Sequence, residues 1–340
     1  MIYLDYAAAT PLSKKAFLAM EPYLTEKFFN PSSPYLPAVE VKREYEAAKN
    51  AIGSCIGVKG AALVMTAGAT ESVNLAFRSF NNCLVSEIEH AAVLATAKTL
   101  PVYGLVKVRP SGVIDVDDLK AKMTEATELV SVGLVNNETG VIQPLKEIAE
   151  LIQVEKINRL KNHNSTPLFL HSDASQGLAL LKLNVAKLGV DLLTLNAGKV
   201  YGPKQVGLLY VRQGAGLKPV LFGGGQELGL RSGTENVAGV VGFATALSEV
   251  VAHIDSERKR LMKLKQLFVS ELKKQFRVAP LKDSPEIGLL GDEKRQLASF
   301  LPITVLGLDA ERLVFMLEER GVLVSTGAAC AASKGAKSHV

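Results

Sequence analysis

The regular alternation of short apolar runs with helical stretches is the feature that most limits how this chain can fold. Apolar runs of strand length begin at Ala61, Cys83, Leu129, Leu168 and Val190, and helical segments separate them. Strands that alternate with helices form a mostly parallel sheet covered on both faces. We therefore expect a large α/β domain whose ligand site lies at the carboxyl ends of its strands.

Length and composition predict two domains. The chain has 340 residues, of which 48% are hydrophobic and 21% charged, as in an ordinary soluble enzyme. We expect residues 12–250 to form the large domain, and residues 1–11 with 251–340 to form a small α+β domain. At the N-terminus, Leu4 to Pro11 is expected as a short strand and Leu12 to Phe29 as a helix. In the small domain, Leu297 to Val305 is expected as a strand.

Several classes of protein are excluded by charge and cysteine content. The net charge is +5, without an arginine-rich run or interleaved aromatic and basic residues, so no nucleic-acid surface is expected. No membrane span or signal peptide is recognised, and we expect a cytoplasmic protein. Three cysteines, Cys55, Cys83 and Cys330, are widely spaced and include no CxxC pair, which argues against a disulfide framework or a metal site.

The most informative stretch is Val190 to Val211, an apolar strand, a turn that carries Lys199, and a second apolar strand. A lysine between buried strands is costly to leave charged, and one solution is its use as an amine nucleophile. A surface lysine such as Lys204 is the commoner case. However, Asp173 and Gln176 end an earlier strand. An acid there with a later lysine suits pyridoxal 5'-phosphate (PLP), whose ring nitrogen pairs with the acid and whose aldehyde joins the lysine.

Three further strand ends carry polar residues. The turn from Thr66 to Thr70 opens a helix whose N-terminal amides would bind an anion, although a helix merely capped by Thr70 explains it equally well. His90 follows another strand, where an imidazole could transfer protons, but a lone histidine is more often structural. Asn137 lies in a loop that an Asx turn would also explain.

These motifs resemble a known family. HSDASQ from His171 and NAGKVYGPKQVG from Asn196 resemble the class V aminotransferase group of PLP enzymes, most closely cysteine desulfurases of the NifS/IscS type. The resemblance extends from LDYAAATP at Leu4 to STGAAC, which ends at Cys330. It implies a PLP-dependent transferase fold of type I, similar to aspartate aminotransferase. Such a fold has a large, mostly parallel seven-stranded sheet domain and a small α+β domain, and it forms a homodimer.

The resemblance also implies roles for individual residues. Lys199 would hold PLP and move the Cα proton, His90 would stack on the ring, and Cys330 would attack the substrate sulfur as a thiolate. Cys330 lies in a loop of Gly, Ala and Ser, where a thiol has no apolar pocket to fill. The implied cofactor-binding residues are Ala69, Thr70, His90, Asn137, Asp173, Gln176, Asn196, Lys199 and, for the partner's phosphate, Thr234.

The implied activity is cysteine desulfuration, which converts L-cysteine to L-alanine and leaves a persulfide on Cys330. The sulfur would pass to an acceptor protein, either an iron–sulfur cluster scaffold or a thiolation enzyme. A selenocysteine lyase or another class V enzyme would share Lys199 and Asp173 without needing Cys330. An inactive PLP-binding partner protein is an alternative of another class, and an accidental truncation without a stable fold is a third.

The chain departs from the family pattern at several positions. Gly198 replaces the usual histidine before the lysine, Asn196 replaces a phosphate-binding serine, and Leu36 replaces a histidine. The chain also ends ten residues after Cys330, where the family continues to an arginine that binds the substrate carboxylate. On this reading, the chain as given is expected to bind PLP but to handle L-cysteine weakly.

Overall fold

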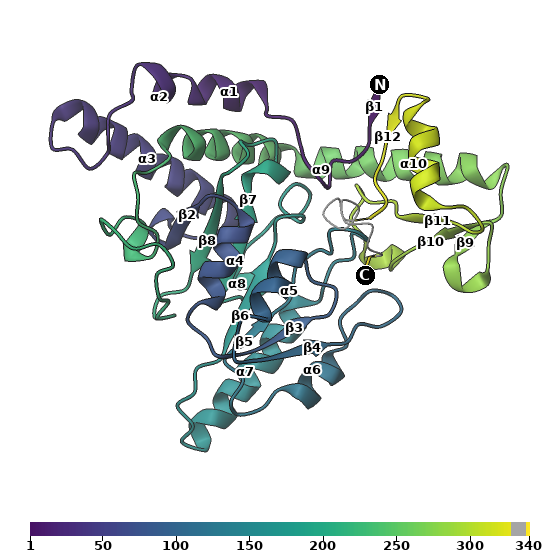
Figure 1. Cartoon of the computed structure of the whole chain (residues 1–340), viewed down its shortest axis with the longest axis horizontal. Helices are drawn as coiled ribbons and strands as arrows, with labels where there is room; N and C mark the ends of the chain where they lie inside the picture. Colours follow the sequence, from purple (N-terminus) through teal and green to yellow (C-terminus); the bar gives the residue numbers. More distant parts are fainter. Residues whose placement is uncertain (328–337) are drawn as a thin grey trace.

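The computed structural model describes residues 1–327 and 338–340 and has a large lobe and a smaller one, joined by a long helix (Figure 1). The large lobe contains a seven-stranded sheet with the order β2-β8-β7-β6-β5-β3-β4. Its strands are β2 (Leu63–Thr66), β3 (Asn82–Ser86), β4 (Val102–Val106), β5 (Leu129–Ser131), β6 (Phe169–Asp173), β7 (Leu192–Asn196) and β8 (Gly207–Val211). β8 is antiparallel to both of its neighbours, and the other pairs are parallel. The mostly parallel seven-stranded sheet expected from the sequence is confirmed.

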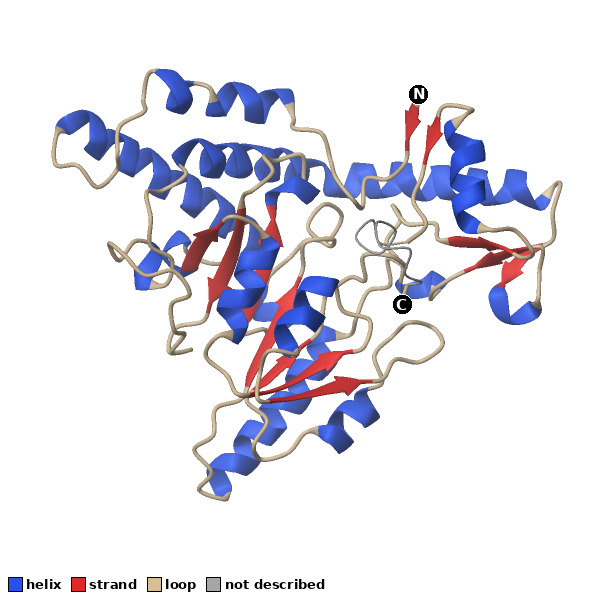
Figure 2. Ribbon diagram, viewed as in Figure 1, coloured by secondary structure: helices blue, strands red, loops and turns tan. Residues whose placement is uncertain are grey.

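Alternate side chains of each strand enter two separate cores. Leu192 and Leu209 face one core, whereas their neighbours Leu193 and Leu208 face the other. The first core contains residues of α4 (Ala69–Phe77) and α5 (Ala91–Ala97). The second contains residues of α3 (Leu36–Ile56), α6 (Val116–Lys122), α7 (Leu145–Lys161), α8 (Val185–Leu188) and α9 (Val237–Lys273). The sheet is therefore covered by helices on both faces, as Figure 2 shows.

The long helix α9 belongs to both lobes. Its first turns are buried against the large sheet through Val240, Phe243 and Leu247, and it then runs on toward the small lobe (Figure 1). Within the described residues it is the one helix long and apolar enough to cross a membrane, but 56% of its most apolar stretch is buried inside the protein. This burial is the behaviour of a core helix.

The small lobe is built from short elements. They are β9 (Val278–Pro280), β10 (Ile287–Leu289), β11 (Ile303–Val305), α10 (Ala310–Glu318) and a two-stranded sheet of β1 (Ile2–Tyr3) with β12 (Val322–Leu323). The expected strand from Leu297 to Val305 is wrong over its first half. There the main-chain N–H of Leu297 donates to the carbonyl of Gly140, and Phe300 packs on that glycine, so this segment joins the lobes.

The N-terminal segment also differs from expectation. The expected helix from Leu12 to Phe29 is divided into α1 (Lys14–Met20) and α2 (Pro22–Thr25), because Pro22 has no N–H to continue the first helix. The expected strand from Leu4 to Pro11 is wrong, since β1 ends at Tyr3. Five short 3₁₀ helices complete the described elements: η1 (Gly60–Ala62), η2 (Ala197–Lys199), η3 (Glu227–Gly229), η4 (Leu281–Asp283) and η5 (Glu293–Arg295).

Candidate active site

Strand register brings the sequence-predicted residues to one edge of the sheet. Asp173, the last residue of β6, is opposite Thr194 of β7. Asn196 at the end of β7 is opposite Gly207, and Gly207 is in turn opposite Thr66 at the end of β2. The turn that follows Thr66 and the turn that carries Lys199 therefore lie on either side of the start of β8. This is the carboxyl edge of the parallel strands, where such sheets bind ligands.

The turn between β2 and α4 is shaped to present free amides. Gly68 has a φ of 134°, a conformation that side chains rarely tolerate, and β8 approaches so closely that a Cβ on Gly207 would lie 2.6 Å from the Cα of Gly68. Among the described residues, no protein acceptor bonds the main-chain N–H groups of Ala69 and Thr70. Thr70 does not cap the helix, because the N-cap is Gly68, which makes no side-chain cap hydrogen bond. These amides suit an anion.

Lys199 ends the 3₁₀ helix η2 and is half-buried. Its Nζ donates to the carbonyl oxygens of Ala7, at 2.6 Å, and Ala8, at 2.8 Å. Gln176 donates its Nε2 to the same Ala7 oxygen at 2.9 Å. The N-terminal segment thus forms one wall of the site, and its residues fail to form the expected strand because their polar main-chain groups bond to this turn.

Asn196 shapes the same turn from its other end. Its Oδ1 accepts a hydrogen bond from the N–H of Gly198 at 3.0 Å, which fixes the start of η2. Its Nδ2 makes no hydrogen bond to the described residues, so this amide group remains a donor at the sheet edge. That is the role expected of Asn196 in place of a serine, and the geometry leaves it available.

Asp173 follows a buried hydrogen-bond network on the same strand. Its Oδ1 accepts from the N–H of Ser175 at 2.9 Å. Two residues earlier, His171 is fully buried, with Nδ1 2.8 Å from Ser131 Oγ and Nε2 2.9 Å from Thr194 Oγ1. Burial lowers the pKa of His171 to about 4, despite the opposing effect of Asp173. The imidazole is therefore neutral near pH 7.

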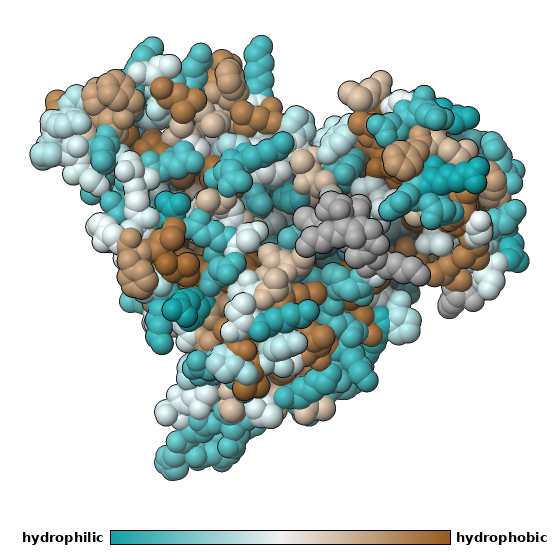
Figure 3. Space-filling model, viewed as in Figure 1, coloured by the Kyte–Doolittle hydropathy of each residue, from teal (hydrophilic) through white to brown (hydrophobic). Residues whose placement is uncertain are grey.

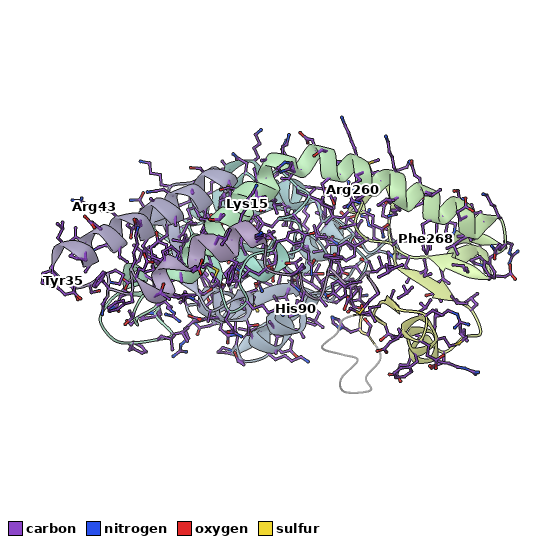
Figure 4. The ribbon with its side chains drawn as sticks, turned by 90° about the horizontal axis from the view of Figure 1, so that it is seen from above. Lys15, Tyr35, Arg43, His90, Arg260 and Phe268 are labelled. Carbon is purple, nitrogen blue, oxygen red and sulfur yellow. The ribbon has the colours of Figure 1, made fainter. Side chains whose placement is uncertain are left out.

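His90 and Glu89 lie together at the end of β3. The Nδ1 of His90 accepts from the N–H of Ala92 at 3.1 Å and caps α5, which assigns its proton to Nε2. Viewed from above, His90 lies on the side of the molecule away from α9 (Figure 4). Glu89 is 5% exposed, and its Oε1 accepts from the N–H of Gly133 at 2.6 Å. Burial raises the pKa of Glu89 to about 8, the Gly133 bond opposes this, and nearby Asp173 adds to it.

The two asparagines of the loop after β5 have separate tasks. Asn136 forms the Asx turn, because its Oδ1 accepts from the N–H groups of Glu138 and Thr139, at 3.0 and 2.8 Å. Its Nδ2 donates to the carbonyl of Ile88, which holds the segment before His90. The side chain of Asn137 is half-buried and makes no hydrogen bond to any described residue. The Asx-turn alternative is thus satisfied by Asn136 and leaves Asn137 available.

Thr234 is the predicted residue that the described part of the chain does not bring into this site. Thr234 is exposed on the loop from Leu221 to Asn236, and no hydrogen bond or ion pair joins it to another described residue. Cys330 lies outside the residues that the structure describes. By contrast, the carbonyls of Ala7 and Ala8 and the buried carboxyl of Glu89 belong to the site but were missed. The one sequence signal for Glu89 was its position beside His90 at a strand end.

A cavity at the opposite end of the sheet lacks the available donors and acceptors of the candidate site. It has a volume of about 370 Å³ and is lined by Thr124, Glu155 and the buried Arg159, among others. Arg159 is already bonded to Glu155 and to the carbonyl oxygens of Thr124, Thr127, Thr166 and Pro167. Its guanidinium therefore fastens loops together and has little capacity left for a ligand.

A comparison with protein families supports one assignment. A family model described as aminotransferase class-V matches residues 2–339. The cysteine desulfurase IscS of Dictyoglomus turgidum is 36% identical over 351 residues, an alignment that covers 100% of this chain and 84% of the relative. The cysteine desulfurase IscS 1 of Archaeoglobus fulgidus is also 36% identical, over 352 residues, with 100% of this chain and 87% of the relative covered.

Solved structures give the same picture. A NifS-like protein superposes with a TM-score of 0.86 and 30% identity, covering 96% of this chain and 87% of that chain. A structure described as SspA in complex with cysteine superposes with a TM-score of 0.80 and 28% identity, covering 100% of this chain and 93% of that one. The similarity extends through the large lobe, α9 and the small lobe.

Proposed function

The chain belongs to the class V aminotransferase family, and we propose that it is a cysteine desulfurase that converts L-cysteine to L-alanine with a persulfide on Cys330. The observation that carries this proposal is similarity over the whole chain to cysteine desulfurases, at 36% identity. The site geometry agrees with it, because Lys199, Asp173 and the amide turn at Ala69 lie at one sheet edge.

The donor set at this edge fits PLP. The unbonded amides of Ala69 and Thr70 suit its phosphate, and the carboxylate of Asp173 suits its protonated ring nitrogen. The amine of Lys199 suits its aldehyde. Asn137 and Asn196 offer amide donors at the rim of the same edge. When bound, PLP supplies a ring that accepts the electron pair released at the substrate Cα.

Lys199 has to leave its present partners in order to work. Its ammonium group is held by the carbonyls of Ala7 and Ala8, which stabilise the charged form. To act as a nucleophile or as a base at the substrate Cα, the amine must lose its proton and turn from these oxygens. The N-terminal segment thus provides a resting position for Lys199, and Gln176 keeps the Ala7 carbonyl in place.

Asp173 and His90 are the other two residues expected to hold or transfer a proton in the site. Asp173, two residues after the neutral His171, would hold the proton on the ring nitrogen of PLP. His90 is fixed through Nδ1, so Nε2–H is its free atom for stacking contacts and for proton relay. Because Nδ1 is occupied by Ala92, a transfer by His90 must begin as donation from Nε2.

The sulfur transfer is assigned to Cys330. The thiolate of Cys330 attacks the sulfur of the substrate, forming an S–S bond while the bond from that sulfur to the substrate Cβ breaks. The electron pair stays with the substrate carbon, which takes up a proton and leaves as L-alanine. Cys83 is an unsuitable alternative, because it is fully buried and burial raises the pKa of its thiol to about 12.

We further propose a cytoplasmic homodimer that passes its sulfur to an acceptor protein. Apolar side chains gather over α1 and α2 on the surface in Figure 3, where Phe17 and Leu24 are 52% and 63% exposed. Phe222, on the loop that carries Thr234, is 83% exposed. Apolar side chains of this size are commonly covered by a partner, and in such a dimer Thr234 would reach the partner's cofactor phosphate.

The proposal is tested by following both products of the reaction. The protein is loaded with PLP and given L-cysteine, L-alanine is quantified, and each cysteine is mapped for persulfide by alkylation and mass spectrometry. Alanine and persulfide are expected in equal amounts, with the persulfide on Cys330. Cys330→Ser should form neither product, whereas Cys55→Ser, at a half-buried cysteine, is the matched control and should behave as the unaltered protein. Alanine release by Cys330→Ser would instead favour a lyase that needs no protein thiol.

A further inference from the structure

The amide turn that suits a phosphate also contains an acid. Glu71 lies in the first turn of α4, next to the free amides of Ala69 and Thr70. Its Oε2 accepts from the N–H of Ala67 at 2.7 Å, which ties the turn to its helix. A carboxylate at a helix N-terminus is stabilised by the helix dipole, but it also repels any anion that binds to the same amides.

An arginine from a distant segment faces this acid. The Nε of Arg231 lies 3.0 Å from Glu71 Oε1, and the two side chains are 25% and 19% exposed. Arg231 belongs to the glycine-rich loop from Leu221 to Asn236. A cavity of about 110 Å³ lies between this loop and the turn, and Arg231 and Ala67 both line it.

The loop that carries Arg231 is itself anchored. Glu227 accepts from the N–H of Met65, on β2, at 2.7 Å and pairs with Lys49 at 3.0 Å, with both charged side chains 5% exposed. The OH of Tyr45 donates to the other oxygen of Glu227. A buried, hydrogen-bonded charge pair of this kind is costly to break from one side. The loop is therefore fixed at Glu227, and this anchor keeps Arg231 near Glu71.

We propose that Arg231 is a positioning residue for the phosphate-binding turn: by neutralising Glu71, it lets that acid fasten the turn without repelling the phosphate of PLP. This inference rests on the proposed function, since it concerns the same cofactor. Glu71 fixes the turn through Ala67, and Arg231 cancels the charge that this fixing brings. Arg231 is not assigned as a ligand of the phosphate.

The two roles of Arg231, charge balance and direct phosphate binding, make opposite predictions for a double variant. Arg231→Gln leaves Glu71 uncompensated and should weaken PLP binding on the order of tenfold, the scale of one charge near a helix terminus. Adding Glu71→Gln removes the repelling charge, and its amide oxygen can still accept from Ala67. The double variant should therefore regain most of the lost affinity. If Arg231 bound the phosphate directly, the second substitution would restore nothing.

Binding is measured by equilibrium dialysis of cofactor-free protein against PLP and, separately, against pyridoxal, which has the aldehyde but no phosphate. The proteins are the unaltered chain, Arg231→Gln, Glu71→Gln and the double variant. Arg212→Gln is the matched control, because Arg212 pairs with Asp191 at 2.7 Å beyond the far end of β8 from the turn. The control should leave both affinities unchanged.

The expected result is a loss of PLP affinity in Arg231→Gln, little change in pyridoxal affinity, and recovery of PLP affinity in the double variant. An equal loss for PLP and pyridoxal, or a double variant no better than Arg231→Gln, would overturn the inference while leaving PLP binding by the unaltered chain intact. If the unaltered chain itself bound neither compound, the proposed function would fail instead.

Discussion

Replacing Glu89 by glutamine should flatten the pH dependence of folding stability in the cofactor-free protein. The carboxyl of Glu89 is 5% exposed, accepts one bond from Gly133 and faces the negative Asp173. Burial is the main cause that raises its pKa from 4.5 to about 8. Glutamine keeps the shape and the acceptor for Gly133 but does not titrate, so it isolates the contribution of this one proton.

The sign and size of the effect follow from the two pKa values. The folded chain holds the proton of Glu89 more tightly than the unfolded chain does, so this group's stabilising contribution is complete below about pH 4.5. As the pH rises toward 8, the unfolded chain releases the proton first, and stability falls by about 1.4 kcal/mol per pH unit. Between about pH 5 and about pH 8 the loss is at most about 4 kcal/mol, relative to the glutamine variant.

Urea denaturation at about pH 5 and about pH 8 would measure the difference. The midpoint of the unaltered protein should fall between these pH values by clearly more than that of Glu89→Gln. Glu87→Gln is the control, because Glu87 lies on the same segment and bonds the N–H of Val108 at 2.8 Å, while Glu89 is retained. Its pH dependence should follow that of the unaltered protein. Parallel pH profiles for Glu89→Gln and the unaltered protein would refute the reasoning and mean that Glu89 is ionised in the fold.

Three further outcomes are expected at the same sheet edge. Borohydride reduction of the PLP-loaded protein should attach the cofactor to Lys199, and peptide mapping of a Lys199→Ala variant should show no transfer of the label to Lys204. Asp173→Asn retains an acceptor for the N–H of Ser175, so the variant should still bind PLP. Steady-state assays should show its turnover reduced on the order of 10²–10³-fold, because the charge facing the ring nitrogen is lost. Near-normal turnover would contradict the role of Asp173. The methyl group of Gly68→Ala would meet no atom within 4 Å, but alanine would have to adopt a main-chain φ of 134°. Thermal unfolding should therefore show the free energy of unfolding lowered by about 1–3 kcal/mol. An unchanged melting temperature would show that the turn relaxes freely.

Sequence patterns predicted the apolar strands of the sheet and the small-residue turns that interrupt them. The sheet was predictable because its central strands are buried on both faces and read as apolar runs, as in Leu192–Asn196. The turn after Thr66 and the turn around Lys199 were predictable because small residues interrupt those runs. Strand ends of a parallel sheet meet at one edge, so the sequence alone predicts that Asp173 and Lys199 lie at the same edge.

The contacts that escaped prediction leave no local trace in the sequence. The carbonyls of Ala7 and Ala8 hold Lys199, but a main-chain oxygen is the same for every residue type. The pair of Glu71 and Arg231 joins segments far apart in the chain, and nothing in the sequence indicates that these two residues pair. In the small lobe, β9 and β10 are three residues long, too short to show a period.

The anchoring of the N-terminal segment has a consequence for how the chain is made. Ala7 and Ala8 are synthesised long before their partner Lys199, which follows all but one strand of the large sheet. Ile2 and Tyr3 wait still longer, because they pair with Val322 and Leu323 at the other end of the chain. During synthesis, one wall of the candidate active site therefore stays unattached, and it is secured only when β12 has been made.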